Sequence, residues 1–189
     1  LANYTITYAS GSLTVTAAPL TVTASNNTKT YGQAFTLAGT GFTTSGLLNS
    51  DSVTSVTLAS SGTGAAAGVS GSPYAITPSA AVGTGLSNYT ISYVNGGLTV
   101  SSKALVVTAS NQSKTYGAAV ALGATAFTTS GLVNSDTVTV VALTSSGASA
   151  SATVASSPYA LRVGSASGAG LANYTITYAS GSLTVTAAP

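Results

Sequence analysis

The sequence contains no cysteine, histidine, methionine, tryptophan or glutamate, and only six of its 189 residues are charged. Without thiols and imidazoles the chain lacks the side chains that usually bind zinc, haem or iron–sulfur clusters. It also lacks the nucleophile–base and paired-carboxylate combinations on which most enzymes depend. We therefore expect no enzyme activity, no cofactor and no metal site, and the sequence offers no catalytic, cofactor-binding or metal-ligating residues.

Scarcity of charge also limits the partners and the location of the protein. A net charge of +2, spread along the chain, is too small to hold nucleic acid, and no run of about 18 apolar residues predicts a membrane span. Hydrophobic residues make up 44% of the sequence, which is too many for a disordered linker. Because so few charges keep copies apart, we expect an extracellular protein that is displayed or assembled outside the cell.

What the chain does have is a tandem repeat, in which one pattern occupies 20–104 and returns at 105–189. The string Lys-Thr-Tyr-Gly at 29–32, for example, returns at 114–117. An ungapped alignment of the two copies gives identical residues at 49 of 85 positions. Such a repeat indicates a series of similar structural units stacked along the chain.

A second identity shows that the units alternate. Residues 1–19 equal residues 171–189 at all 19 positions, but share only 10 with residues 86–104. The full period therefore spans two units, and we expect a parent chain that continues past both ends. The predicted domains are a C-terminal hairpin of a preceding incomplete repeat at 1–18, one repeat unit at 20–103 and a second at 105–188.

Alternating hydrophobicity predicts short strands. Tyr89, Ile91 and Tyr93 alternate with polar residues, and the Gly-rich turn at 95–97 precedes a second alternating stretch, so a hairpin is predicted over 88–100. The same pattern predicts hairpins at 4–15 and 174–185. Further strands are expected at 20–24, 53–58 and 74–76 and at their counterparts in the second unit, whereas 42–49 could hold one helical turn.

These elements predict a mainly β protein of tandem small modules, β-grasp-like or β-sandwich, arranged as a rod. Only residues 101–104 separate the two units, which leaves little freedom for a hinge. Hairpin 1–18 would pack beside the first unit, be completed by a neighbouring chain, or belong to the following unit. The predicted core, with its counterparts in the second unit, is Val22, Tyr31, Leu37, Phe42, Leu47, Val53, Val56, Leu58, Tyr74, Ile76, Leu86, Tyr89, Ile91, Tyr93, Leu98 and Val100.

Five strings in a fixed order resemble the MBG domain of the Tyr-Gly type. They are Leu-Thr-Val-Thr-Ala at 20–24, Lys-Thr-Tyr-Gly at 29–32, Gly-Leu-Leu-Asn-Ser-Asp at 46–51, Asn-Tyr-Thr-Ile at 88–91 and Gly-Leu-Thr-Val at 97–100. The resemblance implies an extracellular, mainly β repeat, similar to the β-grasp modules of mucin-binding adhesin repeats. It also implies long arrays in bacterial surface proteins, including filamentous-haemagglutinin-like adhesins. Many such repeats carry an acidic residue after Tyr-Gly, where this chain has Gln33 and Ala118.

One lysine and one aspartate recur in both units, Lys29 with Asp51 and Lys114 with Asp136. They predict an ion pair or a hydrogen-bonded turn that fixes two loops. A Lys–Asn or Lys–Asp isopeptide crosslink, or a weak calcium site beside Asp51, are the sharper hypotheses.

Three functions fit these features. The first is a structural spacer or stalk repeat of a long adhesin or surface fibre on the bacterial cell surface. The second is a self-assembling filament or biofilm matrix protein, in which chains pair through edge strands. The third is a carbohydrate-binding adhesive module. The expected partners are neighbouring repeats of the same chain, copies of itself in a fibre, and host or matrix glycans.

Overall fold

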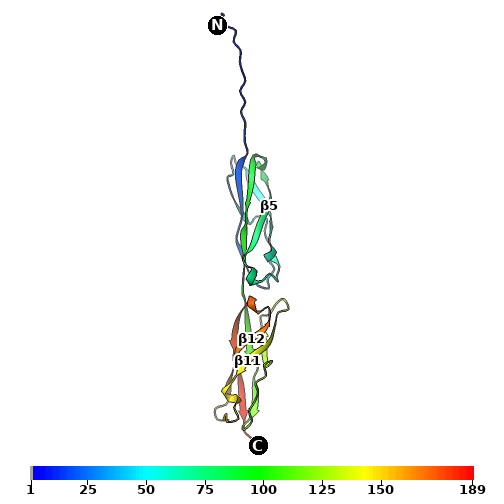
Figure 1. The fold of residues 1–189 in the computed structure, drawn as a ribbon, viewed down its shortest axis with the longest axis vertical. Helices are drawn as coiled ribbons and strands as arrows, with labels where there is room; N and C mark the ends of the chain where they lie inside the picture. Colours follow the sequence, from blue (N-terminus) through cyan, green and yellow to red (C-terminus); the bar gives the residue numbers. More distant parts are fainter. Residues whose placement is uncertain (1) are drawn as a thin grey trace.

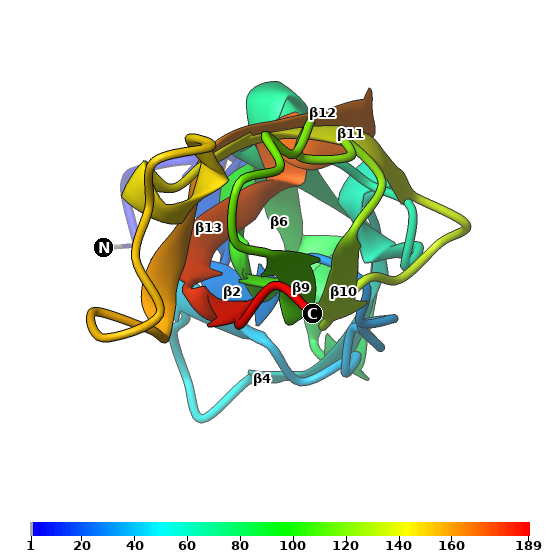
Figure 2. The ribbon, with the colours of Figure 1, turned by 90° about the horizontal axis from the view of Figure 1, so that it is seen from below.

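The computed structural model describes residues 2–189 as two similar β modules stacked end to end (Figure 1). Within this range there is no α-helix, only strands and short 3-10 turns. Each module has two sheets facing each other, so the prediction of tandem, mainly β modules is confirmed. Seen along the long axis from the C-terminal end, the modules overlap in projection (Figure 2).

The first module contains seven strands and three 3-10 turns. One sheet has the order β3-β1-β6 and the other β2-β7-β5-β4. The elements are β1 (Ala18–Ala24), β2 (Asn27–Thr30), β3 (Phe42–Ser45), β4 (Ser52–Ala59), η1 (Ser61–Thr63), η2 (Val69–Gly71), β5 (Tyr74–Thr84), η3 (Leu86–Asn88), β6 (Tyr89–Val94) and β7 (Gly96–Ser101).

The second module repeats this arrangement with sheets β10-β8-β13 and β11-β12-β14-β9. Its elements are β8 (Lys103–Ala109), β9 (Gln112–Thr115), β10 (Phe127–Ser130), β11 (Thr137–Thr144), η4 (Ser146–Ala148), β12 (Tyr159–Ala169), η5 (Leu171–Asn173), β13 (Tyr174–Ala179) and β14 (Gly181–Thr186). Only Ser102 lies between the last strand of the first module and β8.

The hairpin predicted over 88–100 is wrong, because its two strands lie in different sheets. Strand β6 pairs with β1 in parallel, and β7 pairs with β5 and β2. Gly96 makes this crossing possible: a Cβ there would lie 2.5 Å from the carbonyl oxygen of Ala24. The same correction applies to 174–185, where β13 pairs with β8, and β14 with β9 and β12. Alternation identified the strands, but their partners come from distant parts of the chain.

The expected helical turn over 42–49 is also not formed. Residues 42–45 form β3, which pairs antiparallel with β1, Phe42 opposite Ala24. An available strand edge satisfies more backbone groups than a single isolated turn can.

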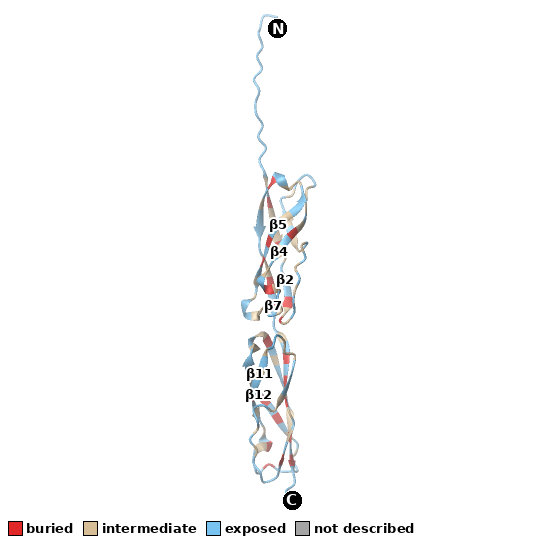
Figure 3. Cartoon of the chain, turned by 90° about the vertical axis from the view of Figure 1, so that its right-hand side faces the viewer, coloured by how far each residue is buried: buried red, intermediate tan, exposed pale blue. Residues whose placement is uncertain are grey.

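The buried residues of each module are few and lie on strands along its length (Figure 3), and most of them are aliphatic. Val22, Ile76 and Leu98 are fully buried as predicted, and so is Leu20, which the sequence analysis omitted. Tyr93 was placed in the core wrongly, since it is 39% exposed. Burial decreases along β6 from Tyr89 through Ile91 to Tyr93, whose hydroxyl accepts a hydrogen bond from the amide of Ala81 at 2.9 Å.

The N-terminal segment differs from its identical copy. Residues 4–17 contain no strand and are exposed, extending away from the first module in Figure 1. Residues 174–187, with the same sequence, contain β13 and β14. The hairpin predicted at 1–18 is thus not formed in residues 2–18, and Leu1 lies outside the described residues. The difference is one of partners: β13 and β14 bond to β8, β9 and β12, and no such strands adjoin residues 4–17.

Candidate functional site at the module junction

The repeated lysine and aspartate do not pair, which corrects the predicted ion pair. The Lys29 ammonium donates to the carbonyl oxygens of Gln33, at 3.0 Å, and Gly64. The Asp51 carboxylate instead accepts from the Tyr89 hydroxyl at 2.8 Å. The lysine is buried among backbone carbonyls, and burial lowers its pKa. These partners give no support to an isopeptide between Lys29 and Asp51.

The second module has the same two arrangements. Lys114 donates to the carbonyl oxygens of Ala118, at 2.8 Å, and Ser149. The Asp136 carboxylate accepts from the Tyr174 hydroxyl at 2.7 Å. Each lysine therefore fixes a loop within its own module, and each aspartate binds a tyrosine hydroxyl in place of the lysine.

Asp136 also binds a residue of the first module, at the junction where the two modules meet. Oδ2 of Asp136 accepts a second hydrogen bond, at 2.9 Å, from the hydroxyl of Tyr31 in the first module. The rings of Tyr31 and Tyr174 meet edge to face with centroids 5.5 Å apart and planes at 81°. Two tyrosines from different modules thus share one carboxylate, and bonds to an ionised acceptor are stronger than neutral ones. We call this group of three side chains the junction triad.

Gly32, next to Tyr31, lets the backbone of the first module approach the side chain of Val133 in the second. Its φ is +84°, a conformation that side chains disfavour. A Cβ at this position would lie 2.6 Å from Cγ2 of Val133 in the second module. The Tyr-Gly pair therefore combines a side chain that reaches across the junction with a residue that leaves room for the neighbour.

Two further hydrogen bonds tie backbone groups of the first module to side chains of the second. The amide of Val69 donates to Oδ1 of Asn173 at 2.9 Å, and Nδ2 of Asn134 donates to the carbonyl of Ala65 at 2.9 Å. Apolar packing is also continuous, since Tyr31 belongs to the same buried cluster as Leu105 of the second module. The junction is therefore a packed, hydrogen-bonded interface rather than a flexible link.

The triad sits in surroundings that disfavour a phenolate. Loss of water on burial, and then the hydrogen bond to Asp136, raise the pKa of Tyr174 from its ordinary 10.0 to about 12. The pKa of Tyr89 is raised in the same direction, mainly by desolvation. At neutral pH both hydroxyls are protonated, as donation to the aspartates requires.

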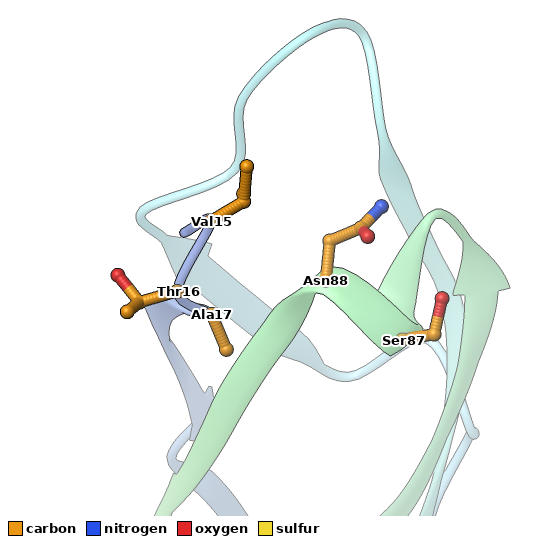
Figure 4. Close-up of a pocket in the computed structure, with 5 residues that line it drawn as sticks. All are labelled: Val15, Thr16, Ala17, Ser87 and Asn88. Atoms are coloured by element: carbon orange, nitrogen blue, oxygen red, sulfur yellow. The ribbon is translucent and has the colours of Figure 1, made fainter. Parts of the chain in front are cut away.

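The residues equivalent to the junction triad lie at the outer ends of the two modules. Tyr31 is 4% exposed, but its counterpart Tyr116 is 47% exposed. At the opposite end a cavity of about 330 Å³ surrounds Asp51 and Tyr89; its other lining residues are Val15, Thr16, Ala18, Leu48, Asn49 and Asn88. A shallower neighbouring pocket lies between the N-terminal segment and the side chains of Ser87 and Asn88 (Figure 4).

Tyr31 and Asp136 both belong to strings that repeat in the sequence, but their pairing was not predicted. Tyr31 was predicted to lie in the core of its own unit, and each aspartate was predicted to pair with the lysine of the same unit. Tyr31 and Asp136 are 105 residues apart, so the partner lies further along the chain than Tyr116, the repeat of Tyr31 itself. The repetition of the Tyr-Gly pair in both units was the available signal for a contact between units.

Residues 2–189 contain no group of three or more aspartate, glutamate, histidine or cysteine side chains that could hold a metal ion. Over the same range, no helix is long and apolar enough to cross a membrane. What the geometry defines is an apolar and hydrogen-bonded surface that joins one module to the next.

Fold and junction together define a tandem β-sandwich repeat whose modules are built to stack. The family model of the MBG domain (YGX type) matches residues 20–99 and 105–184, and the chain belongs to this family. The resemblance drawn from the sequence is confirmed, and the two matched segments correspond to the two modules. Neither the curated proteins nor the solved structures compared with the chain provide a match.

Proposed function

We propose that this chain is a spacer repeat in the stalk of a long extracellular bacterial adhesin or surface fibre. The junction triad carries the proposal. The direction of one module relative to the next is fixed by the carboxylate that Tyr31 and Tyr174 share and by the close packing of Gly32 against the Val133 side chain. Only one residue, Ser102, lies between the flanking strands. Modules that stack end to end in a fixed direction form an extended molecule, which is what a stalk requires.

The composition supports this role. Six charged residues in 189 leave a surface of hydroxyl and small apolar groups, suited to packing beside other extracellular polymers. MBG domains occur in surface proteins, which agrees with this location. We retain 20–103 and 105–188 as the proposed boundaries of the repeat units.

Immunogold electron microscopy on intact source cells tests the proposal. Antibodies raised against this chain are expected to label unpermeabilised cells, with gold particles standing away from the envelope. Permeabilised cells serve as the control for total antigen. Labelling that appears only after permeabilisation would contradict both the location and the role.

A further inference from the structure

The chain carries both halves of its own junction at its outer ends. We call Leu48, Asn49, Asp51, Asn88 and Tyr89 the socket. We call Tyr116 and Gly117, with the carbonyl of Ala150 and the amide of Val154, the tip. We propose that a second copy of this chain binds end to end, its tip entering the socket. The inference rests on the proposed function insofar as the same stacking interface serves both.

The socket already has the geometry of the occupied junction. Oδ2 of Asp51 accepts from Tyr89 at 2.8 Å, compared with 2.7 Å for the Asp136–Tyr174 bond. The amide of Leu48 donates to the Tyr89 hydroxyl at 2.8 Å, and the equivalent bond to Tyr174 is 2.9 Å. A tip that enters this cavity therefore meets a preorganised acceptor and requires little rearrangement.

The tip matches the group that fills the junction within the chain. Gly117 has φ +88°, against +84° at Gly32, and a Cβ there would meet nothing within 4 Å. The amide of Tyr116 donates to the carbonyl of Thr186 at 2.8 Å, as Tyr31 does to Ser101 at 2.9 Å. Tip and socket repeat the residues of the known pair except at one position, where the socket has Leu48 in place of Val133. The Tyr116 hydroxyl is therefore expected to donate to Asp51.

The route of the chain across the junction adds a second requirement. Residues 101–104 cross it within the molecule, and their counterparts are 186–189 of one copy and 16–19 of the next. At a junction between two copies, residues 186–189 of one copy and 16–19 of the next would both occupy the place that residues 101–104 fill within the molecule. That place holds a single segment. Because 2–19 and 172–189 have the same sequence, the first can replace the second, taking the places of β13 and β14 in the neighbouring copy.

The exchanged segment makes the same contacts in the module that β13 and β14 made. The exchange also forms a new junction between the two copies. The released C-terminal residues then take the exposed place that the N-terminal segment held. Tip and socket are different surfaces at opposite ends, so the contact is head to tail and continues into a linear polymer. Exchange must be slow, since Tyr174 and Leu183 are buried and have to leave first. In a longer chain the same socket would receive the tip of a preceding module.

Cysteine crosslinking between two singly substituted chains tests the proposal, because the native sequence has no cysteine. Thr177 pairs with Val106 in the register of β13 and β8, and Thr7 is the counterpart of Thr177 in the N-terminal segment. Full-length Thr7→Cys and Val106→Cys proteins are mixed at high concentration for days and then oxidised. We expect a disulfide heterodimer that accumulates with time and concentration.

Two controls make the outcome specific. Thr128→Cys replaces Val106→Cys in a parallel mixture, because Thr128 is exposed on β10, at the other edge of β8 from β13. We expect at least a five-fold lower heterodimer yield from it, and a similar loss when Tyr116→Ala is added to the Val106→Cys chain. Equal yields from both mixtures, or oligomers by light scattering without the specific crosslink, would overturn the inference. Surface labelling of cells is independent of this result, so the spacer role can stand if exchange fails.

Discussion

At the scale of single residues, Asp136 is the residue that links the two modules. Its carboxylate accepts from one tyrosine of its own module and from one of the preceding module. Among residues 2–189, the equivalent Asp51 has one hydroxyl donor, Tyr89 of its own module. One carboxylate therefore contributes both to the folding of a module and to the attachment of the next.

Tyr31→Phe tests the bond across the junction. The substitution removes the hydroxyl that donates to Asp136 and keeps the ring, so we expect a loss of about 1–3 kcal/mol in the free energy of unfolding. Tyr116→Phe is the matched control, because that hydroxyl belongs to an exposed side chain, and it should change stability by less than about 0.5 kcal/mol. Urea denaturation of both variants measures the difference. Equal losses would show that the shared carboxylate adds nothing.

The raised pKa of Tyr174 predicts how stability depends on alkaline pH. Below pH 10.0 the hydroxyl is protonated in the folded and unfolded states, so its contribution is fully present. Between 10.0 and about 12 the unfolded chain releases the proton first, and the contribution is lost as pH passes the folded value.

We expect the urea midpoint of the native protein to fall more steeply from pH 9.5 to pH 12 than that of Tyr174→Phe. The phenylalanine variant starts from lower stability, because it lacks the bond to Asp136, but it has no proton to release. Parallel curves for the two proteins would contradict the assigned burial of Tyr174.

At the scale of elements, local pattern determines where strands lie but not which strands they join. Alternation identified β6 and β7 correctly, yet predicted a hairpin, because neighbouring strands are the simplest partners. In the structure they separate into facing sheets, with Tyr89 and Leu98 buried. Register and partner depend on contacts with distant residues, and a single sequence does not display them.

The two copies of one sequence make the same point. Residues 174–187 contain two strands, and the identical residues 4–17 contain none. Propensity is equal in the two places by definition, so the supply of hydrogen-bonding edges decides. The junction residues were recognisable because they repeat, but a Lys–Asp pair seemed the natural interpretation of two recurring charges. Each aspartate instead accepts from a tyrosine of its own module, and Asp136 accepts also from Tyr31 of the other module. Both lysines donate to backbone carbonyls.

Gly32→Ala tests the close approach of the modules, with Gly117→Ala as its matched control. Both substitutions place a side chain at a positive φ, so both carry the same backbone strain. Only the first adds a methyl group against Val133, which should cost about 1–3 kcal/mol more. The truncation Val133→Ala should recover part of this excess in the double variant. Equal destabilisation by the two alanines in thermal unfolding would argue against a packed junction.

At the scale of the whole molecule, two modules are held in one fixed orientation relative to each other. Tyr31 and Val100, at the end of the first module, belong to the buried cluster of the second module, and one residue separates the flanking strands. Hinge motion would have to break the junction triad and expose this cluster to water. Each further module added in the same way extends the molecule without adding flexibility.

The distance distribution between the modules tests this claim most directly. Spin labels are attached to Thr57→Cys and Ala142→Cys, which are equivalent exposed strand positions in a chain that has no other cysteine. Pulsed electron paramagnetic resonance at low protein concentration then measures the distance between the two labels. We expect one narrow distance, and a broad distribution once Tyr31→Ala is added. A distribution that is already broad in the labelled protein, or that Tyr31→Ala leaves narrow, would contradict the account.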